Sequence, residues 1–335
     1  MGTTILVTGS AGFVGSHVTK ELLKRDYRVI GIDCLTDYYS VELKTLRMTN
    51  FDTHGNFSFA NIDLSNADET EKVFQENEIE GVIHLAAQAG VRLPLEVTEK
   101  YIDSNITGFF NILKNSIKYE IPSFVYASSS SVYGDLSPLP YSESSKLLSP
   151  KSFYGATKLN NEQTAPILTS GTRTSTRGLR FFTVYGPWGR PDMAYFRLMA
   201  AALEKHNFQI FGDGTIERDF TYIDDVVSST IQLFENLSKS ETKVDDIVNI
   251  GGQRPLSMNY LIHQVQQISG RKLDISIKQS NPSDSQKTVA DNSYLKSLIG
   301  ETGFTPLEDG LENFYSWMKS PGVFEHVENW VKSSI

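Results

Sequence analysis

Tyr154 and Lys158 stand four residues apart in the segment YGATK. On a helix this spacing places both side chains on one face, so the lysine ammonium can stabilise a phenolate. An unperturbed tyrosine titrates at about pH 10. A neighbouring positive charge lowers that pKa and makes Tyr154 a usable base for taking a proton from an alcohol. The same spacing is common by chance, so its weight depends on the residues around it.

A run of serines precedes this pair, in the segment YASSSSVYG that begins at Tyr126. The segment continues an apolar stretch that predicts a strand, and open α/β sheets bind their ligands at the carboxyl ends of strands. Ser129, with its neighbours Ser130 and Ser131, could hydrogen-bond a reacting hydroxyl and direct its proton to Tyr154. A polar surface loop would have the same composition, but the position after a strand favours a catalytic role.

Three glycines in the segment TGSAGFVG follow the apolar run TILV near the start of the chain. In a strand–turn–helix corner, Gly9 permits the tight turn, Gly12 lets the backbone approach a phosphate, and Gly15 lets the helix pack closely. Phe13 and Val14 belong to the same turn. The free N–H groups of the helix N-terminus attract an anion. The pattern therefore predicts a site for the pyrophosphate of a dinucleotide.

Two carboxylates are placed to select the adenosine half of such a cofactor. Asp33 ends the second predicted strand, where a carboxylate accepts hydrogen bonds from ribose hydroxyls and repels a 2′-phosphate, which favours NAD over NADP. Asp63 and Leu64 follow the third predicted strand and are expected to lie near the adenine. Small residues end the fourth strand and would let the backbone pass close to the cofactor: Leu85, Ala86 and Ala87.

Composition narrows the class of protein further. The chain has 335 residues, 39% of them hydrophobic, and a net charge of −9, which disfavours nucleic acid and anionic membranes as partners. No apolar run approaches the roughly 20 residues of a membrane span, and no signal segment is evident. The single Cys34 cannot form an internal disulfide, which is typical of a reducing compartment. We therefore expect a cytoplasmic protein with no metal site.

Strands alternate with helices through the first half of the chain. The pattern predicts strands at Thr4–Thr8, Arg28–Asp33, Phe57–Asn61, Gly81–Leu85, Ser123–Ser128 and Gly178–Phe182. It predicts helices between them at Phe13–Asp26, Asn66–Asn77, Thr98–Tyr119 and Ser152–Leu168. This order is typical of an α/β fold with a doubly wound parallel sheet.

The second half of the chain has a looser pattern. We expect a Rossmann domain at residues 1–182 and a smaller nucleotide-sugar-binding α/β lobe at 183–335, some of whose elements return to the main sheet. Pro166 is expected to break the helix that carries Tyr154, and the polar stretch Thr169–Arg177 to form a surface loop.

At this point the chain resembles the extended short-chain dehydrogenase/reductase family. The segments GSAGFVG, HLAAQAGVR, ASSSSVYG, YGATK, GPWGRPDM and RDFTYIDDV carry the resemblance, and within the family they are most similar to the UDP-glucuronate 4-epimerases. The resemblance implies NAD that stays tightly bound and is recycled, a UDP-sugar substrate, and Tyr154, Lys158 and Ser129 as the catalytic set. It also implies a homodimer formed through two helices of the Rossmann domain.

Several residues bear on the substrate. The family places diphosphate contacts near Arg218, and Asp284 matches a family segment near the nucleotide, in which a departure at Ser285 makes Lys287 a candidate for phosphate. For the sugar, the candidates are Gln88, Arg92, Thr183 and Arg190. An arginine forms a bidentate pair with a carboxylate, and a neutral hexose needs no such charge, so Arg92 and Arg190 suggest a uronic acid.

The expected reaction is inversion at C4 through a 4-keto sugar, with Arg190 and Thr183 restraining a carboxylate that would otherwise leave as carbon dioxide. A 4,6-dehydratase is disfavoured, because no carboxylate stands among Ser129, Ser130 and Ser131. UDP-glucuronate decarboxylase and UDP-glucose 4-epimerase remain open. A non-catalytic NAD sensor is disfavoured, because both Tyr154 and Lys158 are present.

Overall fold

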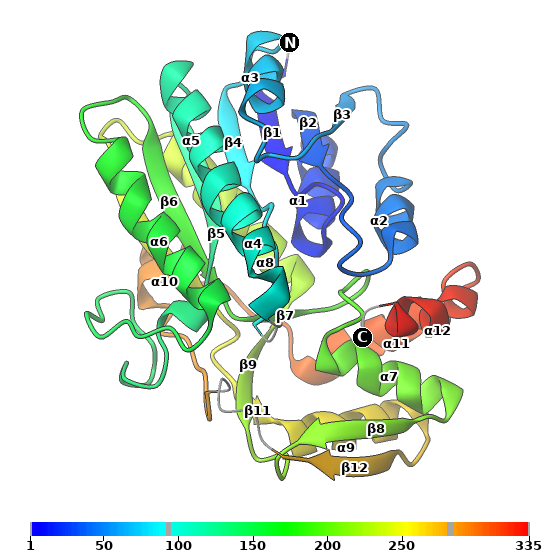
Figure 1. Cartoon of the computed structure of the whole chain (residues 1–335). Coiled ribbons are helices and arrows are strands. Elements are labelled where there is room, and N and C mark those ends of the chain that lie inside the picture. The colour runs from blue at the N-terminus through cyan, green and yellow to red at the C-terminus, as the bar shows by residue number, and fades with distance from the viewer. Residues whose placement is uncertain (1, 92–94, 280–284, 334–335) are drawn as a thin grey trace.

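The computed structural model describes residues 2–91, 95–279 and 285–333. A parallel sheet of seven strands forms the larger part, with helices on both faces (Figure 1). In sheet order the strands are β10 (Asp245–Ile250), β6 (Ser175–Phe181), β5 (Ser123–Ser129), β4 (Gly81–His84), β1 (Thr4–Thr8), β2 (Arg28–Asp33) and β3 (Phe57–Asn61). The doubly wound α/β fold expected from the sequence is confirmed.

Side-chain alternation along β1 explains the two helical layers. Ile5 and Val7 face one side of the sheet and join a core with α1 (Phe13–Lys24) and α8 (Ile223–Ser238). Leu6 faces the other side and joins a separate core. Because both faces are covered at the centre of the sheet, β1 and β4 are buried along their whole length, and β1 reads as a nearly continuous apolar run. The helices of the second layer are α3 (Ala67–Gln75), α5 (Phe109–Lys118) and α6 (Phe153–Leu168).

A smaller part is built from short strands and later helices, below the large sheet in Figure 1. One sheet has the order β11 (Pro255–Ser257), β9 (Glu217–Tyr222) and β7 (Thr183–Tyr185), and a two-stranded parallel sheet pairs β12 (Asp274–Lys278) with β8 (Asn207–Phe211). Its helices are α7 (Ala194–Glu204), α9 (Met258–Ser269), α11 (Leu307–Met318) and α12 (Phe324–Lys332). Helix α10 (Ser293–Ile299) packs instead against α8 and β10 of the larger part. The helix α2 (Val41–Met48) follows β2.

The chain returns to the large sheet after the first elements of the smaller part. Strand β10 pairs with β6 in parallel register, from Asp245 opposite Thr176 to Ile250 opposite Phe181. The expected surface loop Thr169–Arg177 is therefore wrong at its end: β6 begins at Ser175, and the Arg177 side chain is 2% exposed. A buried ion pair explains the arginine there, because Asp246 binds its guanidinium with both oxygens at 2.7 and 2.8 Å.

Two expected helices differ from the prediction. The Thr98–Tyr119 helix is interrupted: η1 (Leu95–Val97) and α4 (Thr98–Tyr101) lead into a π-helical turn, η2 (Ile102–Gly108), before α5. Pro166 does not break α6, which continues to Leu168. The proline removes one hydrogen bond, to the carbonyl of Glu162, and the helix ends two residues later, so the loss is confined to its last turn. No helix among the described residues is long and apolar enough to cross a membrane.

Candidate active site

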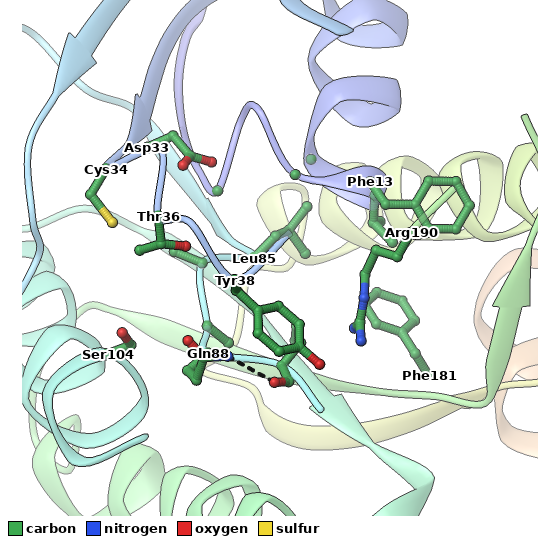
Figure 2. A pocket seen from close by; sticks show the side chains of 18 of the residues that line it. Phe13, Asp33, Cys34, Thr36, Tyr38, Leu85, Gln88, Ser104, Phe181 and Arg190 are labelled. Atoms are coloured by element: carbon green, nitrogen blue, oxygen red, sulfur yellow. Dashed lines mark hydrogen bonds between the residues drawn. The ribbon is translucent and has the colours of Figure 1, made fainter. Parts of the chain in front are cut away.

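A pocket of about 270 Å³ lies at the carboxyl ends of the large sheet (Figure 2). Its wall includes the turn after β1, the last residue of β2, the segments after β3 and β4, and the end of β5. Strands β6 and β7, with the residue between them, add Phe181, Phe182 and Val184. Residues far apart in the sequence meet here because all parallel strands of the sheet end at the same edge.

The glycine turn between β1 and α1 leaves no room for side chains. Gly9 has φ +72°, and a Cβ on it would lie 2.8 Å from the backbone nitrogen of Ala86. A Cβ on Gly15 would lie 2.0 Å from the Gly9 carbonyl oxygen, and one on Gly12 would lie 2.9 Å from the same atom. The three glycines therefore allow the backbone segments of the turn to pack closely, and they leave its backbone uncovered by side chains.

Helix α1 begins directly at this turn. Its N-cap is Gly12, which supplies no side-chain oxygen to the first N–H groups. Those groups and the helix dipole remain available to an anion. Phe13 and Val14, in the first turn, line the pocket with the three glycines. This arrangement fits the pyrophosphate of a dinucleotide.

Asp33 lies at the end of β2 and lines the pocket. Its two oxygens accept hydrogen bonds from the backbone nitrogens of Ala11, at 3.2 Å, and Leu35, at 2.8 Å. These bonds fix the carboxylate, and each oxygen keeps a lone pair for a ribose hydroxyl. Asp63 is exposed, and its Oδ1 accepts from the backbone nitrogen and the hydroxyl of Ser65 at 2.9 Å. Both Asp63 and the buried Leu64 line the pocket.

The segment after β4 forms the floor beside the cofactor turn. Leu85, Ala86 and Ala87 line the pocket, as does the buried Gln88. Asn105, from the π-helical turn, accepts from the Gln88 backbone nitrogen at 2.8 Å and donates to its carbonyl at 3.2 Å.

Helix α6 brings Tyr154 and Lys158 to the pocket in its first two turns. The Ser152 hydroxyl caps the helix by accepting from the backbone nitrogen of Gly155 at 3.1 Å. The Lys158 ammonium lies 5.9 Å from the centre of the Tyr154 ring and donates to the Ala127 carbonyl at 3.0 Å. Helix α6 and strand β5 are thus joined at the Tyr154–Lys158 pair.

Burial changes the titration of both members of this pair. It lowers the pKa of Lys158 to about 8, although the carboxylate of Glu162 opposes the shift. Burial raises the pKa of Tyr154, while the charge of Arg190 and the hydroxyl of Ser129 lower it. The phenol therefore needs positive charge beside it to act as a base near neutral pH.

Only the first part of the serine run lines the pocket, and the rest lies just behind it. Ser129 ends β5 and lines the pocket, and its hydroxyl donates to the Ser131 hydroxyl at 3.1 Å and accepts from the Ser131 backbone nitrogen at 3.1 Å. Ser130 and Ser131 lie in η3 (Ser130–Val132), one residue beyond the lining.

Arg190 reaches the opposite end of the pocket from Asp33, next to Tyr38 (Figure 2). Arg190 is already paired with a carboxylate: its Nε and Nη2 donate to the two oxygens of Asp192 at 3.0 and 2.5 Å. The Tyr38 hydroxyl donates to the same carboxylate at 3.2 Å. Among the described residues the Arg190 Nη1 has no acceptor, so one nitrogen of the fork remains for a ligand.

The remaining sequence candidates lie outside the pocket lining. Thr183 begins β7 but does not line the pocket. Arg218 donates to the carbonyl oxygens of Glu217 and Ser285 at 3.0 and 2.7 Å. Lys287 binds the Glu217 carboxylate at 2.6 Å.

Two candidates, Arg92 and Asp284, lie outside the described residues.

Sequence reasoning missed several lining residues. Tyr38 and Lys44 come from the segment between β2 and β3, where no helix was expected, and Ser104 comes from the π-helical turn. The motif GRPDM contained Asp192, but its pairing with Arg190 depends on the fold of that loop. Among the described residues, no cluster of three or more His, Cys, Asp or Glu side chains could hold a metal.

Comparisons with known proteins agree with this geometry. The model of the NAD dependent epimerase/dehydratase family matches residues 5–251. A UDP-glucuronate 4-epimerase of Thermodesulfobacterium geofontis is 40% identical over 320 residues, which cover 94% of this chain and 95% of that protein. The protein CapI of Staphylococcus aureus is 39% identical over 326 residues, covering 93% and 97%.

Among solved structures, UDP-glucuronic acid 4-epimerase from Bacillus cereus, in complex with UDP-glucuronic acid and NAD, superposes with a TM-score of 0.87. It is 36% identical to this chain, and the match covers 95% of this chain and 99% of that one.

Proposed function

Because this chain belongs to the NAD dependent epimerase/dehydratase family, we propose that it is an NAD-dependent isomerase that interconverts UDP-glucuronate and UDP-galacturonate. One observation carries the choice of substrate: Arg190 lies in the same pocket as Tyr154 and Lys158 and still offers Nη1 to an acceptor. A carboxylate on the sugar would use that nitrogen. The relatives from Thermodesulfobacterium geofontis and Bacillus cereus support the same substrate.

The residues present fit NAD. The glycine turn bares its backbone and α1 begins without a side-chain cap, as a pyrophosphate requires. Asp33 offers a fixed carboxylate for ribose hydroxyls and repels a 2′-phosphate. When bound, NAD would supply the redox chemistry, reversible hydride transfer at C4 of the sugar with no net oxidation.

The chain's own residues move the proton. The Tyr154 oxygen takes the proton of the C4 hydroxyl and gives it back after the sugar has turned over, as general base and then general acid. The Lys158 ammonium stabilises the phenolate by its charge, and the Ser129 hydroxyl holds the reacting oxygen in line with Tyr154. Arg190 holds the carboxylate so that the bond to it does not align with the C4 ketone. That restraint opposes the loss of carbon dioxide.

The test uses the purified protein with UDP-glucuronate and no added NAD, followed by NMR. Formation of UDP-galacturonate with its carboxyl group retained is the expected result. A UDP-pentose would identify a decarboxylase instead. No reaction with UDP-glucuronate, together with turnover of UDP-glucose, would show that Arg190 does not select the substrate.

Two further expectations remain predictions. We propose a homodimer formed through α5 and α6, the helices that carry the exposed Phe110 and Ile167; sedimentation of the purified protein measures its oligomeric state. The cytoplasmic location inferred from the lone cysteine also stays a prediction.

A further inference from the structure

Arg47, on helix α2, is a buried arginine that joins three separate segments. Its side chain is among the largest fully buried ones, with 1% exposed. Its Nη1 donates to the Ala11 carbonyl in the glycine turn at 3.1 Å and to the Tyr39 hydroxyl at 2.6 Å. Its Nε and Nη2 donate to the carbonyls of Trp188 and Gly189 at 2.8 and 3.0 Å. One guanidinium thus joins the glycine turn to the loop that carries Arg190.

The charge of Arg47 has no carboxylate partner among the described residues. Every hydrogen-bond acceptor named above is a carbonyl or a phenol, and a buried guanidinium without a counter-charge is costly. The acceptor carbonyl of Ala11 belongs to the turn that fits a pyrophosphate. A dinucleotide held at this turn would bring negative charge to the same turn, and that charge would offset part of the charge of Arg47 through the low-dielectric interior.

The loop held by Arg47 has a conformation that needs support. Trp188 has φ +61°, in the left-handed region that bulky residues rarely adopt. A Cβ on Gly189 would lie 1.7 Å from the Tyr195 hydroxyl, so the next residue is constrained as well. The Trp188 ring packs on Trp317, with centroids 5.1 Å apart. Arg47 binds the carbonyls of Trp188 and Gly189, which directly precede Arg190.

We propose that Arg47 is a positioning residue that couples the glycine turn, where NAD would bind, to Arg190, which would bind the substrate carboxylate. By holding Trp188 and Gly189, it sets where the Arg190 fork lies, and by its charge it favours the pyrophosphate. The substrate half of this inference, that Arg47 places Arg190, rests on the proposed function. The cofactor half, that Arg47 favours the pyrophosphate, requires only that the chain binds NAD.

The test compares Arg47→Met and Arg47→Lys with the matched control Arg271→Met. Arg271 also donates to main-chain carbonyls, those of Ala202 and Leu203, but it is exposed and contacts neither the glycine turn nor the loop of Trp188 and Gly189. For each protein we would measure the NAD retained per chain after exhaustive dialysis, the melting temperature, and kcat/KM for UDP-glucuronate. The two Arg47 variants are then repeated in an Arg190→Ala background.

Arg47→Met is expected to lose bound NAD and to lower kcat/KM roughly 10- to 100-fold when NAD is saturating, because a displacement of about 1 Å costs up to 100-fold. Arg47→Lys keeps the charge but not the fork, so it should retain NAD and still lose kcat/KM. In the Arg190→Ala background either change should lower kcat/KM less than about threefold, because residues that act through one another are not additive. Arg271→Met should match the wild type.

Equal losses of kcat/KM with and without Arg190 would overturn the coupling, as would an Arg47→Lys protein with wild-type kcat/KM. If Arg47→Met does not fold, the Arg47→Lys pair decides the substrate half. A wild-type protein that retains NAD but does not convert UDP-glucuronate would refute the proposed function. The NAD content of the variants would still decide the cofactor half.

Discussion

Replacing Arg190 by lysine keeps a positive charge beside Asp192 but removes the fork. In the structure Asp192 occupies Nε and Nη2 of the guanidinium, and Nη1 remains for the substrate carboxylate. A lysine has one nitrogen, which the partly buried Asp192 carboxylate would bind. The variant should therefore stay folded and lose one charge-assisted hydrogen bond to the sugar.

Such a bond contributes about 1.5–3 kcal/mol. At about 1.4 kcal/mol for each factor of ten, kcat/KM for UDP-glucuronate should fall roughly 10- to 150-fold. Initial rates followed by NMR over a range of substrate concentrations give the ratio. UDP, which lacks the sugar, should inhibit both proteins equally, which controls for the nucleotide site. An Arg190→Lys enzyme with kcat/KM within about twofold of the wild type would refute the assignment of Arg190 to the carboxylate.

Three other replacements test the site. Tyr154→Phe should reduce turnover by about 10²- to 10⁴-fold without loss of NAD; NMR and NAD content measure this, and a loss below tenfold would remove Tyr154 from proton transfer. The pKa of Lys158 is about 8 in the fold and 10.5 ordinarily, so the unfolded chain binds more protons between these values and wild-type stability rises with pH. Urea denaturation of Lys158→Met should lack that rise, worth about 3 kcal/mol; identical pH profiles would contradict the shift. Gly15→Ala would put a Cβ 2.0 Å from the Gly9 carbonyl oxygen, whereas a Cβ on Gly303 meets nothing within 4 Å. Melting temperature and NAD retention should therefore fall for Gly15→Ala but not Gly303→Ala, and equal values would refute the packing argument.

The sequence was informative where chemistry and local pattern coincide. Strand β1, the glycine turn and the start of α1 were predictable because an apolar run ends where three glycines begin, and the same holds for β5 and its serines. The helix that carries Tyr154 and Lys158 was predictable from spacing.

Other features depend on contacts between distant residues. The extra length of β6 reflects its pairing with β5 on one side and with β10, about 70 residues later, on the other, and Thr169–Arg177 gives no local sign of either. Trp188, whose backbone is left-handed, is bound by Arg47, and the Asp192 carboxylate is bound by Arg190. Hydrophobic periodicity in the sequence does not reveal either pair. The interrupted helix near Asn105 follows from its bonds to Gln88, which hold the turn in a π-helical form.

The return of β10 to the large sheet limits how relatives of this protein can be recombined. A chimera joined at residue 182 would take β10 and α8 from the wrong parent. Phe234 of α8 sits so close to Gly81 that a Cβ there would lie 2.4 Å from its ring, and β10 covers the edge of β6. A graft that changes the sugar pocket should instead replace residues 183–222, 251–290 and 301–333, and keep 223–250 and 291–300 with the large sheet, because α10 packs against α8 and β10. The unit of exchange is three separate stretches of gene and not one half of it.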